Sequence, residues 1–74
     1  MSIAANKVRG IRCAHCTDVF CAEVTRQHND SNMIAMGTRI SSPEDIIKMT
    51  LIFLKTDFSG EERHKRRVEK IEKF

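Results

Sequence analysis

The sequence predicts an α/β fold, in which helices cover the faces of a parallel β-sheet. Two short apolar segments, Ile11–Cys16 and Met33–Met36, have the composition of buried strands, and a longer helical segment follows each of them. Alternating strands and helices are typical of parallel sheets with right-handed crossovers. Two strands alone are too few for such a sheet, which needs cover on both faces. We therefore expect residues 1–74 to form a single partial domain of an α/β protein, whose other strands either lie outside these residues or come from a partner.

The first half of the chain is predicted to hold a short helix, a strand and a longer helix. Ser2–Val8 contains two alanines and suits one or two helical turns before Gly10 interrupts it. After the first strand, Thr17 or Asp18 can cap a helix over Val19–His28, because short polar side chains accept hydrogen bonds from the first free backbone N–H groups. A polar turn then leads to the second strand.

The second half begins with the clearest helix start in the sequence. Ser42 is a good N-cap and Pro43 fits the first helical position, which predicts a helix from Pro43 to about Lys55. This helix is apolar on more than one face, so we expect it to be buried between the sheet and a partner subunit. The remaining residues, 61–74, are predicted to form a basic amphipathic helix that packs on a partner subunit.

Charge and cysteine content limit the classes of function. The net charge is +3, and the basic residues gather in the last helix, where they could meet phosphorylated metabolites, nucleic acid or an anionic membrane. No apolar stretch approaches the roughly 20 residues of a membrane span, so we expect no membrane partner. Three cysteines, an odd number without a secretory signal in Met1–Val8, predict reduced thiols and a cytoplasmic location.

The cysteines also suggest a competing zinc site. Cys13, Cys16, Cys21 and His28 supply enough soft ligands for one zinc ion in principle. On a strand, however, Cys13 and Cys16 point to opposite faces, and free cysteines are more often small buried hydrophobic residues. We therefore expect no metal, and we keep a small zinc-binding or nucleic-acid-binding protein as a weaker alternative.

Four side chains are candidates for binding or acid/base chemistry. His28 ends a helix beside a polar turn, and a side chain with a pKa near about 6.5 can donate and accept protons at neutral pH. Arg63 and Arg67 are four residues apart on the last helix, so both could hold one phosphate. Arg39 follows a strand end, where α/β folds place ligands. The alternatives are a histidine at a helix dipole and ordinary surface arginines.

Five segments together carry a recognisable signature. They are Ser2–Val8 (SIAANKV), 10–13 (GIRC), 26–30 (RQHND), 36–39 (MGTR) and 58–67 (FSGEERHKRR). In this order and spacing they resemble the sugar-phosphate isomerase family that contains type B ribose-5-phosphate isomerase and the galactose-6-phosphate isomerase subunits. The resemblance covers nearly all of the chain.

The resemblance implies a Rossmann-like three-layer α/β/α sandwich with a parallel sheet, a homodimer with active sites shared between subunits, and a sugar phosphate substrate. The implied reaction, a step of the pentose phosphate pathway, interconverts ribose 5-phosphate and ribulose 5-phosphate through an enediol without metal or organic cofactor. His28 would be the acid/base that opens the sugar ring, and Asn29 would hydrogen-bond the substrate. The residues expected to bind the phosphate are Arg39, Arg63 and Arg67.

One part of the family pattern is missing. Family members carry a glycine-rich loop immediately before the segment that matches Met1, with a catalytic base that is a cysteine at the head of that loop or a glutamate at the position of Met1. The three cysteines of this chain do not match that position. The resemblance therefore implies the C-terminal half of an isomerase without its base, or alternatively a non-catalytic module for phosphosugar binding or dimerisation.

Overall fold

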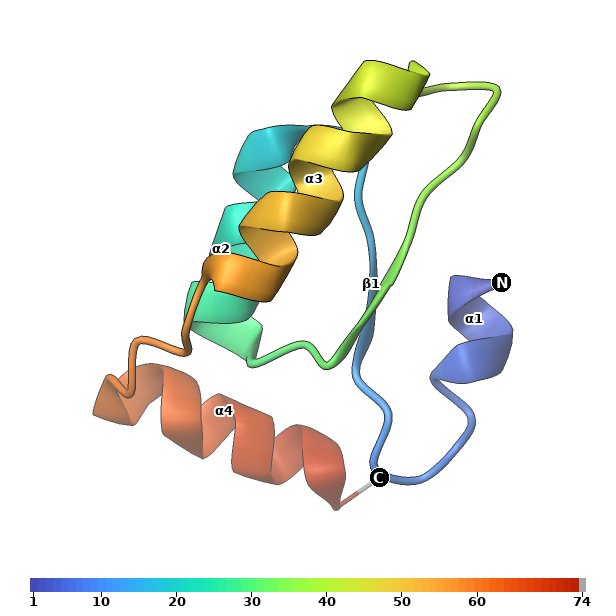
Figure 1. The fold of residues 1–74 in the computed structure, drawn as a ribbon. Helices are drawn as coiled ribbons and strands as arrows, with labels where there is room; N and C mark the ends of the chain where they lie inside the picture. The colour runs from blue at the N-terminus through green and yellow to red at the C-terminus, as the bar shows by residue number, and fades with distance from the viewer. Residues whose placement is uncertain (74) are drawn as a thin grey trace.

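The computed structural model describes residues 1–73 and contains four helices and two strands (Figure 1). In chain order the elements are α1 (Ser2–Ala5), β1 (Cys13–His15), α2 (Val19–Asn29), β2 (Met33–Ala35), α3 (Pro43–Lys55) and α4 (Glu62–Glu72). Every predicted element is present, and the strands are shorter than predicted. The predicted end of the last helix, Phe74, lies outside the described residues.

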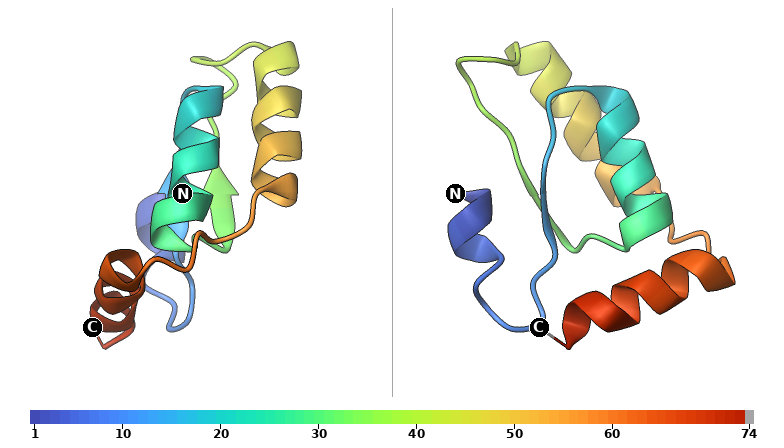
Figure 2. Two further views of the ribbon diagram at one scale, coloured as in Figure 1. Left: turned by 90° about the vertical axis from the view of Figure 1, so that its left-hand side faces the viewer. Right: turned by 180° about the vertical axis from the view of Figure 1, so that it is seen from behind.

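The sheet is parallel, as predicted, with Cys13 of β1 opposite Met33 of β2 and His15 opposite Ala35. Helices α2 and α3 lie against one face of the sheet, and the short α1 lies on the opposite side of β1 (Figures 1 and 2). The three layers of an α/β/α arrangement are therefore present, although one outer layer consists of a single helical turn.

The helix boundaries follow from local side-chain chemistry. Asp18, one of the two predicted caps, accepts a hydrogen bond of 2.7 Å from the backbone N–H of Cys21 at the start of α2. Ser42 caps α3 in the same way, with Pro43 at the first position as predicted. Helix α2 ends at Asp30, whose φ of 47° places it in the left-handed region and turns the chain toward β2.

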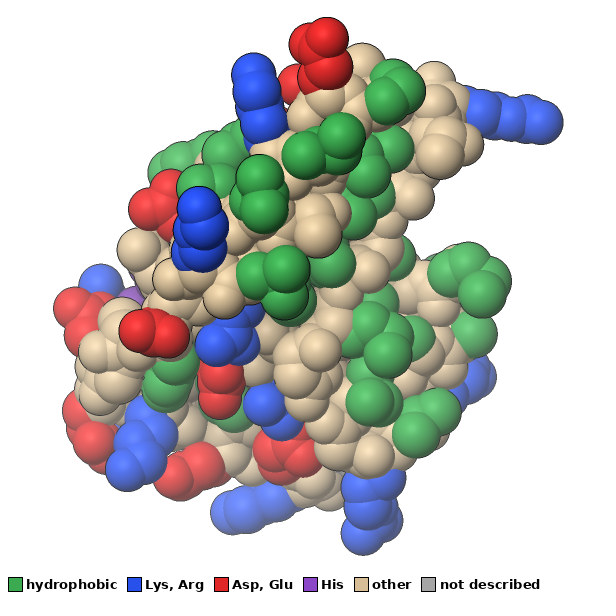
Figure 3. Space-filling view, in the orientation of Figure 1, with side chains coloured by type: hydrophobic (Ala, Val, Ile, Leu, Met, Phe, Trp, Pro, Cys, Tyr) green, Lys and Arg blue, Asp and Glu red, His purple; other side chains and the backbone are tan. Residues whose placement is uncertain are grey.

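The hydrophobic core lies between the sheet, α2 and α3. Cys16, Ala22 and Met49 are fully buried. The partly buried apolar side chains packed around them are Ala14, Val19, Cys21, Ile34, Met36, Ile46 and Ile52. Within residues 1–73 the outer face of α3 is not covered, because Ile47 and Leu54 are exposed. Figure 3 shows hydrophobic side chains in green along the face of the molecule where α3 lies. The width of the apolar pattern on α3 therefore exceeds what one chain buries.

Helix α4 crosses the C-terminal end of α2 within the same chain (Figure 1). An ion pair between Arg12 and Glu72 joins the loop before β1 to the end of α4, and Arg12 also lies 3.6 Å from a carboxylate oxygen of Asp30. None of the helices in residues 1–73 is both long and apolar enough to cross a lipid bilayer.

Candidate functional site

His28, the predicted acid/base, stacks face to face on His64 where α2 meets α4. The two ring centroids are 4.2 Å apart and the planes are inclined by only 13°. His28 is half-buried, whereas His64 is only 4% exposed. The α2–α4 crossing therefore fixes the plane of the His28 ring by packing it against a second, buried ring.

The surroundings of His64 favour its neutral form. Burial lowers the pKa of His64 below its usual value, and electrostatic interactions with His28, Arg63 and Arg67 act in the same direction, whereas Glu61 opposes them. The Nδ1 atom of His64 lies 3.1 Å from Nη2 of Arg67. Because an arginine nitrogen can only donate, Nδ1 accepts and the ring proton belongs on Nε2.

The Nε2 atom of His64 faces Glu61 without forming a well-aligned hydrogen bond. It lies 3.0 Å from a carboxylate oxygen of Glu61, but the approach is too far from the N–H direction to satisfy the buried donor. The carboxylate thus contributes an electrostatic attraction to the N–H group of His64 while the ring stays in place through stacking and Arg67.

Arg67 joins α4 to the last turn of α2. Its Nη2 atom lies 2.6 Å from the backbone oxygen of His28 and 2.9 Å from the side-chain oxygen of Asn29. The other guanidinium nitrogens form no hydrogen bond with residues 1–73, and the residue is exposed. Arg67 therefore positions His28 and Asn29 and still has N–H groups available for a ligand.

Arg63, the second predicted phosphate ligand on α4, is paired differently. Its guanidinium lies 3.3 Å from a carboxylate oxygen of Glu61, and its side chain is 72% exposed. Exposed ion pairs of this kind contribute only about 0 to 1 kcal/mol, so a phosphate dianion can displace Glu61 from Arg63. Arg63 and Arg67 lie one turn apart on α4, as expected, but they make different contacts.

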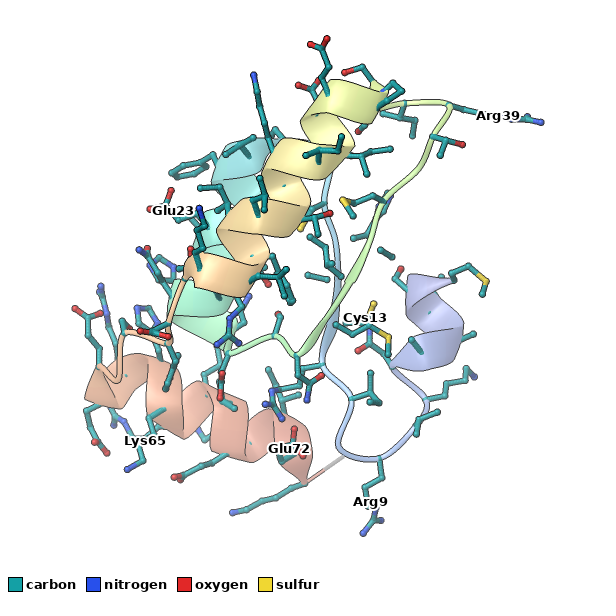
Figure 4. All side chains as sticks on the ribbon, viewed as in Figure 1. Arg9, Cys13, Glu23, Arg39, Lys65 and Glu72 are labelled. Carbon is teal, nitrogen blue, oxygen red and sulfur yellow. The ribbon has the colours of Figure 1, made fainter. Side chains whose placement is uncertain are left out.

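Arg39 lies far from this group of residues. Figure 4 labels it at the outer edge of the loop between β2 and α3, whereas α4 lies at the opposite end of the molecule. The views in Figure 2 show the same separation of that loop from α4. One chain therefore brings His28, Asn29 and Arg67 together and leaves Arg39 apart.

A groove of about 310 Å³ lies beside this cluster, between β1, α2 and α4. Asn29 and Arg67 both line it, and its remaining lining residues are Asn6, Arg12, Cys13, Ala14, Thr25, Ser31 and Ile71. His28 does not line the groove. Within the described part of the chain, the candidate residues thus form an open cluster and not one enclosed pocket.

A network of hydrogen bonds around Arg26 fixes the C-terminal end of α2. Arg26 donates to the backbone oxygens of Thr56 at 2.9 Å and Ser31 at 2.6 Å, and to the carboxylate of Asp30 at 3.0 Å. The hydroxyls of Thr25 and Ser31, both buried, hydrogen-bond each other at 2.5 Å. These contacts fix the segment on which His28 and Asn29 stand.

The cysteines do not gather into a metal site in residues 1–73. No group of three or more His, Cys, Asp or Glu side chains converges there in a way that could hold a metal ion. Cys16 and Cys21 lie in the core cluster, whereas Cys13 is outside it. The set of three cysteines and His28 is therefore not brought together within the described residues.

Sequence reasoning missed the stacking of His64 on His28. It also missed Arg26 as a support for α2 and Asn6 as a backbone partner of Cys13. These contacts join residues far apart in sequence, and no local pattern marks them. The RQHND segment places Arg26 next to the candidate residues in sequence. It does not show that the Arg26 side chain turns toward Thr56 and Ser31.

Comparisons with known proteins agree with this architecture. The family model for Ribose/Galactose Isomerase matches residues 1–71. "Putative sugar phosphate isomerase YwlF" of Bacillus subtilis (strain 168) is 49% identical over all of this chain and 49% of its own length. Ribose-5-phosphate isomerase B of Escherichia coli (strain K12) is 41% identical over 96% of this chain and 47% of its own length.

The fold comparison gives the same result. The structure of type B ribose 5-phosphate isomerase from Trypanosoma cruzi superimposes with a TM-score of 0.95 and 51% identity, over 97% of this chain and 48% of that chain. The solved type B isomerases that this chain resembles have a Rossmann-like fold, so the predicted α/β fold is confirmed, whereas the packing of the C-terminal helix on a partner subunit stays a prediction. The chain spans about half the length of the curated relatives it matches.

Proposed function

Because the chain belongs to the ribose/galactose isomerase family, we propose that it is the sugar-phosphate-binding half of an aldose–ketose isomerase. The reaction is the interconversion of ribose 5-phosphate and ribulose 5-phosphate, the activity named for its relatives from E. coli and T. cruzi. The observation that carries this proposal is the half-buried ring of His28, held by His64 and flanked by Asn29 and Arg67.

His28 has the role of acid/base in ring opening. The furanose opens when the ring oxygen gains a proton and the hydroxyl at C1 loses one, which a neutral or protonated imidazole can assist near pH 7. A fixed ring plane favours this step, because proton transfer requires the imidazole nitrogen to lie within hydrogen-bonding distance of the sugar oxygen. The stacking on His64 supports this role.

The phosphate and the hydroxyls of the substrate have separate partners. The free N–H groups of Arg67 and the exposed guanidinium of Arg63 can donate paired hydrogen bonds to phosphate oxygens. Asn29 is then available to the sugar hydroxyls. Arg67 connects the two functions, since it also contacts the side chain of Asn29.

Two copies of the domain account for Arg39. In one chain Arg39 lies at the opposite end of the molecule from α4 (Figure 4), so a phosphate bound by α4 needs the Arg39 of a second copy. The exposed apolar face of α3, with Ile47 and Leu54, and the outer side of α4 are surfaces on which a partner subunit can pack. We therefore propose a homodimer in which each sugar-phosphate site draws on both subunits.

The enediol-forming base belongs, in this proposal, to the half of the isomerase domain that these residues do not cover. A chain without that base binds the substrate and does not turn it over. A non-catalytic phosphosugar-binding or dimerisation module is the alternative. A cytoplasmic location remains a prediction, which is based on the free cysteines.

The test joins this chain to the complementary half of the B. subtilis relative and measures isomerisation of ribose 5-phosphate by proton NMR. We expect turnover by the chimera, and a loss of at least about 100-fold in kcat with His28→Asn, since general acid/base groups contribute factors of about 100 or more. Arg67→Met should raise KM. Lys65→Met, a change on the same helix outside the candidate set, is the matched control.

The chain by itself provides a second readout. We expect ribose 5-phosphate to shift the amide resonances of α4 and the end of α2, and free ribose to have little effect. A folded chimera that binds ribose 5-phosphate without turnover would support the non-catalytic alternative. A chimera whose activity does not change with His28→Asn would contradict the role of His28.

A further inference from the structure

We propose that Cys16 and Cys21 form a redox-active thiol pair, which a hydroperoxide converts into an intramolecular disulfide. The two Sγ atoms are 3.4 Å apart. Cys16 follows β1 directly, and Cys21 lies in the first turn of α2. A disulfide needs an S–S distance of about 2.05 Å, so the two sulfur atoms must move closer together before they can bond.

The two thiols differ in their access to solvent, which gives each a role. Cys16 is fully buried, and Cys21 is partly exposed beside a shallow surface hollow lined also by Asp18, Phe20 and Val24. Burial, reinforced by the contact with Cys21, raises the pKa of the Cys16 thiol to about 12, so Cys16 stays protonated at neutral pH. Cys21 is therefore the thiol that meets the oxidant, and Cys16 is the one that resolves it.

Formation of the disulfide needs a hydroperoxide as its only co-reactant. The Cys21 thiolate attacks the peroxide O–O bond, takes one oxygen as a sulfenic acid and releases hydroxide, or an alcohol from an organic hydroperoxide. The Cys16 sulfur then attacks the Cys21 sulfur, the S–O bond breaks, and the oxygen leaves as water with the proton of Cys16. Two thiols are oxidised by two electrons to one disulfide while one peroxide is reduced.

The third cysteine is separated from this pair by the strand geometry. Ala14 and Cys16 both belong to the core cluster on the α2 side of the sheet, and Cys13 lies outside it. Successive side chains on a strand point to opposite faces, so Cys13 faces away from Cys21. The reaction is therefore specific for one of three possible pairs.

The pair is independent of the proposed isomerase function. It lies at the N-terminal end of α2, whereas His28 stands at the C-terminal end of the same helix. The disulfide would link the end of β1 to the start of α2 and leave the candidate residues free. Oxidation can thus be measured without a substrate, and its failure would say nothing about isomerisation.

The test exposes the full chain, folded in dilute buffer, to hydrogen peroxide and follows the intact mass and the bridged peptides by mass spectrometry. We expect a mass loss of two hydrogen atoms and a single bridge between Cys16 and Cys21. Cys13→Ser should behave in the same way. Cys21→Ser should lose the reaction and keep Cys16 as a free thiol.

The same oxidation in 6 M urea separates native geometry from chance. The unfolded wild-type chain should give a mixture of bridges that include Cys13, whereas the folded chain gives one. The proposal is overturned if the folded chain gives the same mixture, or bridges through Cys13. It is also overturned if Cys16 stays free after an exposure that fully oxidises dithiothreitol in a parallel sample.

Discussion

The two ends of α2 are held by different kinds of interaction. At the N-terminal end, Ala22 and its neighbours pack against Cys16 and Met49 in the fully buried core. The C-terminal end is held instead by hydrogen bonds from Arg26 and Arg67 and by the stacked pair of histidines. The N-terminal end of α2 is held mainly by apolar packing. The C-terminal end has almost no fully buried apolar side chain and is held mainly by hydrogen bonds and ring stacking.

This difference separates stability from geometry. Apolar burial is proportional to area and tolerates small displacements, whereas hydrogen bonds and ring stacking require defined distances and angles. The candidate site stands at the end that is fixed by directional contacts. Changes at the apolar end should therefore unfold the chain, and changes at the polar end should shift the side chains that bind the ligand.

The largest effect is expected from Met49→Ala at the apolar end. Met49 is fully buried between α2, α3 and the sheet, and its truncation removes buried methylene groups and leaves a cavity, which costs about 3 kcal/mol of unfolding free energy. Urea denaturation followed by circular dichroism measures this. Met49→Leu, which conserves volume, should cost less than about 1.5 kcal/mol. Equal losses for both variants would mean that packing at Met49 does not stabilise this end.

A smaller loss is expected from Arg26→Met at the polar end. The change keeps an unbranched side chain against Phe53, whose ring centroid lies 5.7 Å from the guanidinium carbon. It removes the donors to the backbone oxygens of Thr56 and Ser31, and we expect a cost of about 2 kcal/mol. The same urea experiment measures this cost.

The comparison with Arg26→Lys sharpens this prediction. A lysine keeps the charge near Asp30 but cannot reach Thr56 and Ser31 with one planar group, so it should recover only part of the stability. NMR shifts of the His28 and Asn29 backbone should change in both variants. Unchanged shifts would show that the Arg26 network does not position the candidate residues.

The smallest effect is a dependence of stability on pH through His64. Its pKa is lowered in the folded chain from the usual 6.5, so above about pH 7 His64 is neutral in both states and contributes no pH dependence. As the pH falls below 6.5, the unfolded chain takes up a proton at His64 that the folded chain resists. Stability should therefore decrease with acidification from about pH 7 to pH 5.

The matched variant for this effect is His64→Phe, which keeps a ring for stacking on His28 and cannot be protonated. Its unfolding free energy should fall less steeply over the same pH range than that of the wild type. Parallel pH profiles for the two proteins would exclude His64 as the source of the dependence.

Much of the fold was predictable because its signals are local. Ser42 as a cap, followed by Pro43, predicted the start of α3. The alternation of short apolar strands with helices predicted the parallel sheet. Of the two candidate caps for α2, Asp18 is the one used. The assigned strands are shorter than predicted, although the residues that flank β1 still bond to β2: the backbone oxygen of Arg12 accepts from Met33, and the backbone N–H of Cys16 donates to Ala35.

The candidate site was only partly predictable, because its geometry depends on contacts between distant segments. The spacing of Arg63 and Arg67 predicted a shared helix face, and the structure keeps it. Nothing local shows that Arg67 turns back to His28 or that Glu61 takes up Arg63. The sheet-facing side of α3 is buried as expected, and the opposite side is exposed in residues 1–73. The expected packing of that opposite side on a partner subunit stays a prediction.

The amide of Asn6 has a consequence for association between copies. It donates to the backbone oxygen of Cys13 at 2.8 Å and accepts from its backbone N–H at 2.7 Å, as an adjacent strand would. These backbone groups lie on the edge of β1 that faces away from β2, because the alternate residues Arg12 and Cys16 bond to the β2 side. The Asn6 side chain therefore satisfies the backbone groups of Cys13 on this edge of β1. Fewer backbone groups are left for a strand of another copy to pair with, and such edge-to-edge pairing is the first step of fibril growth.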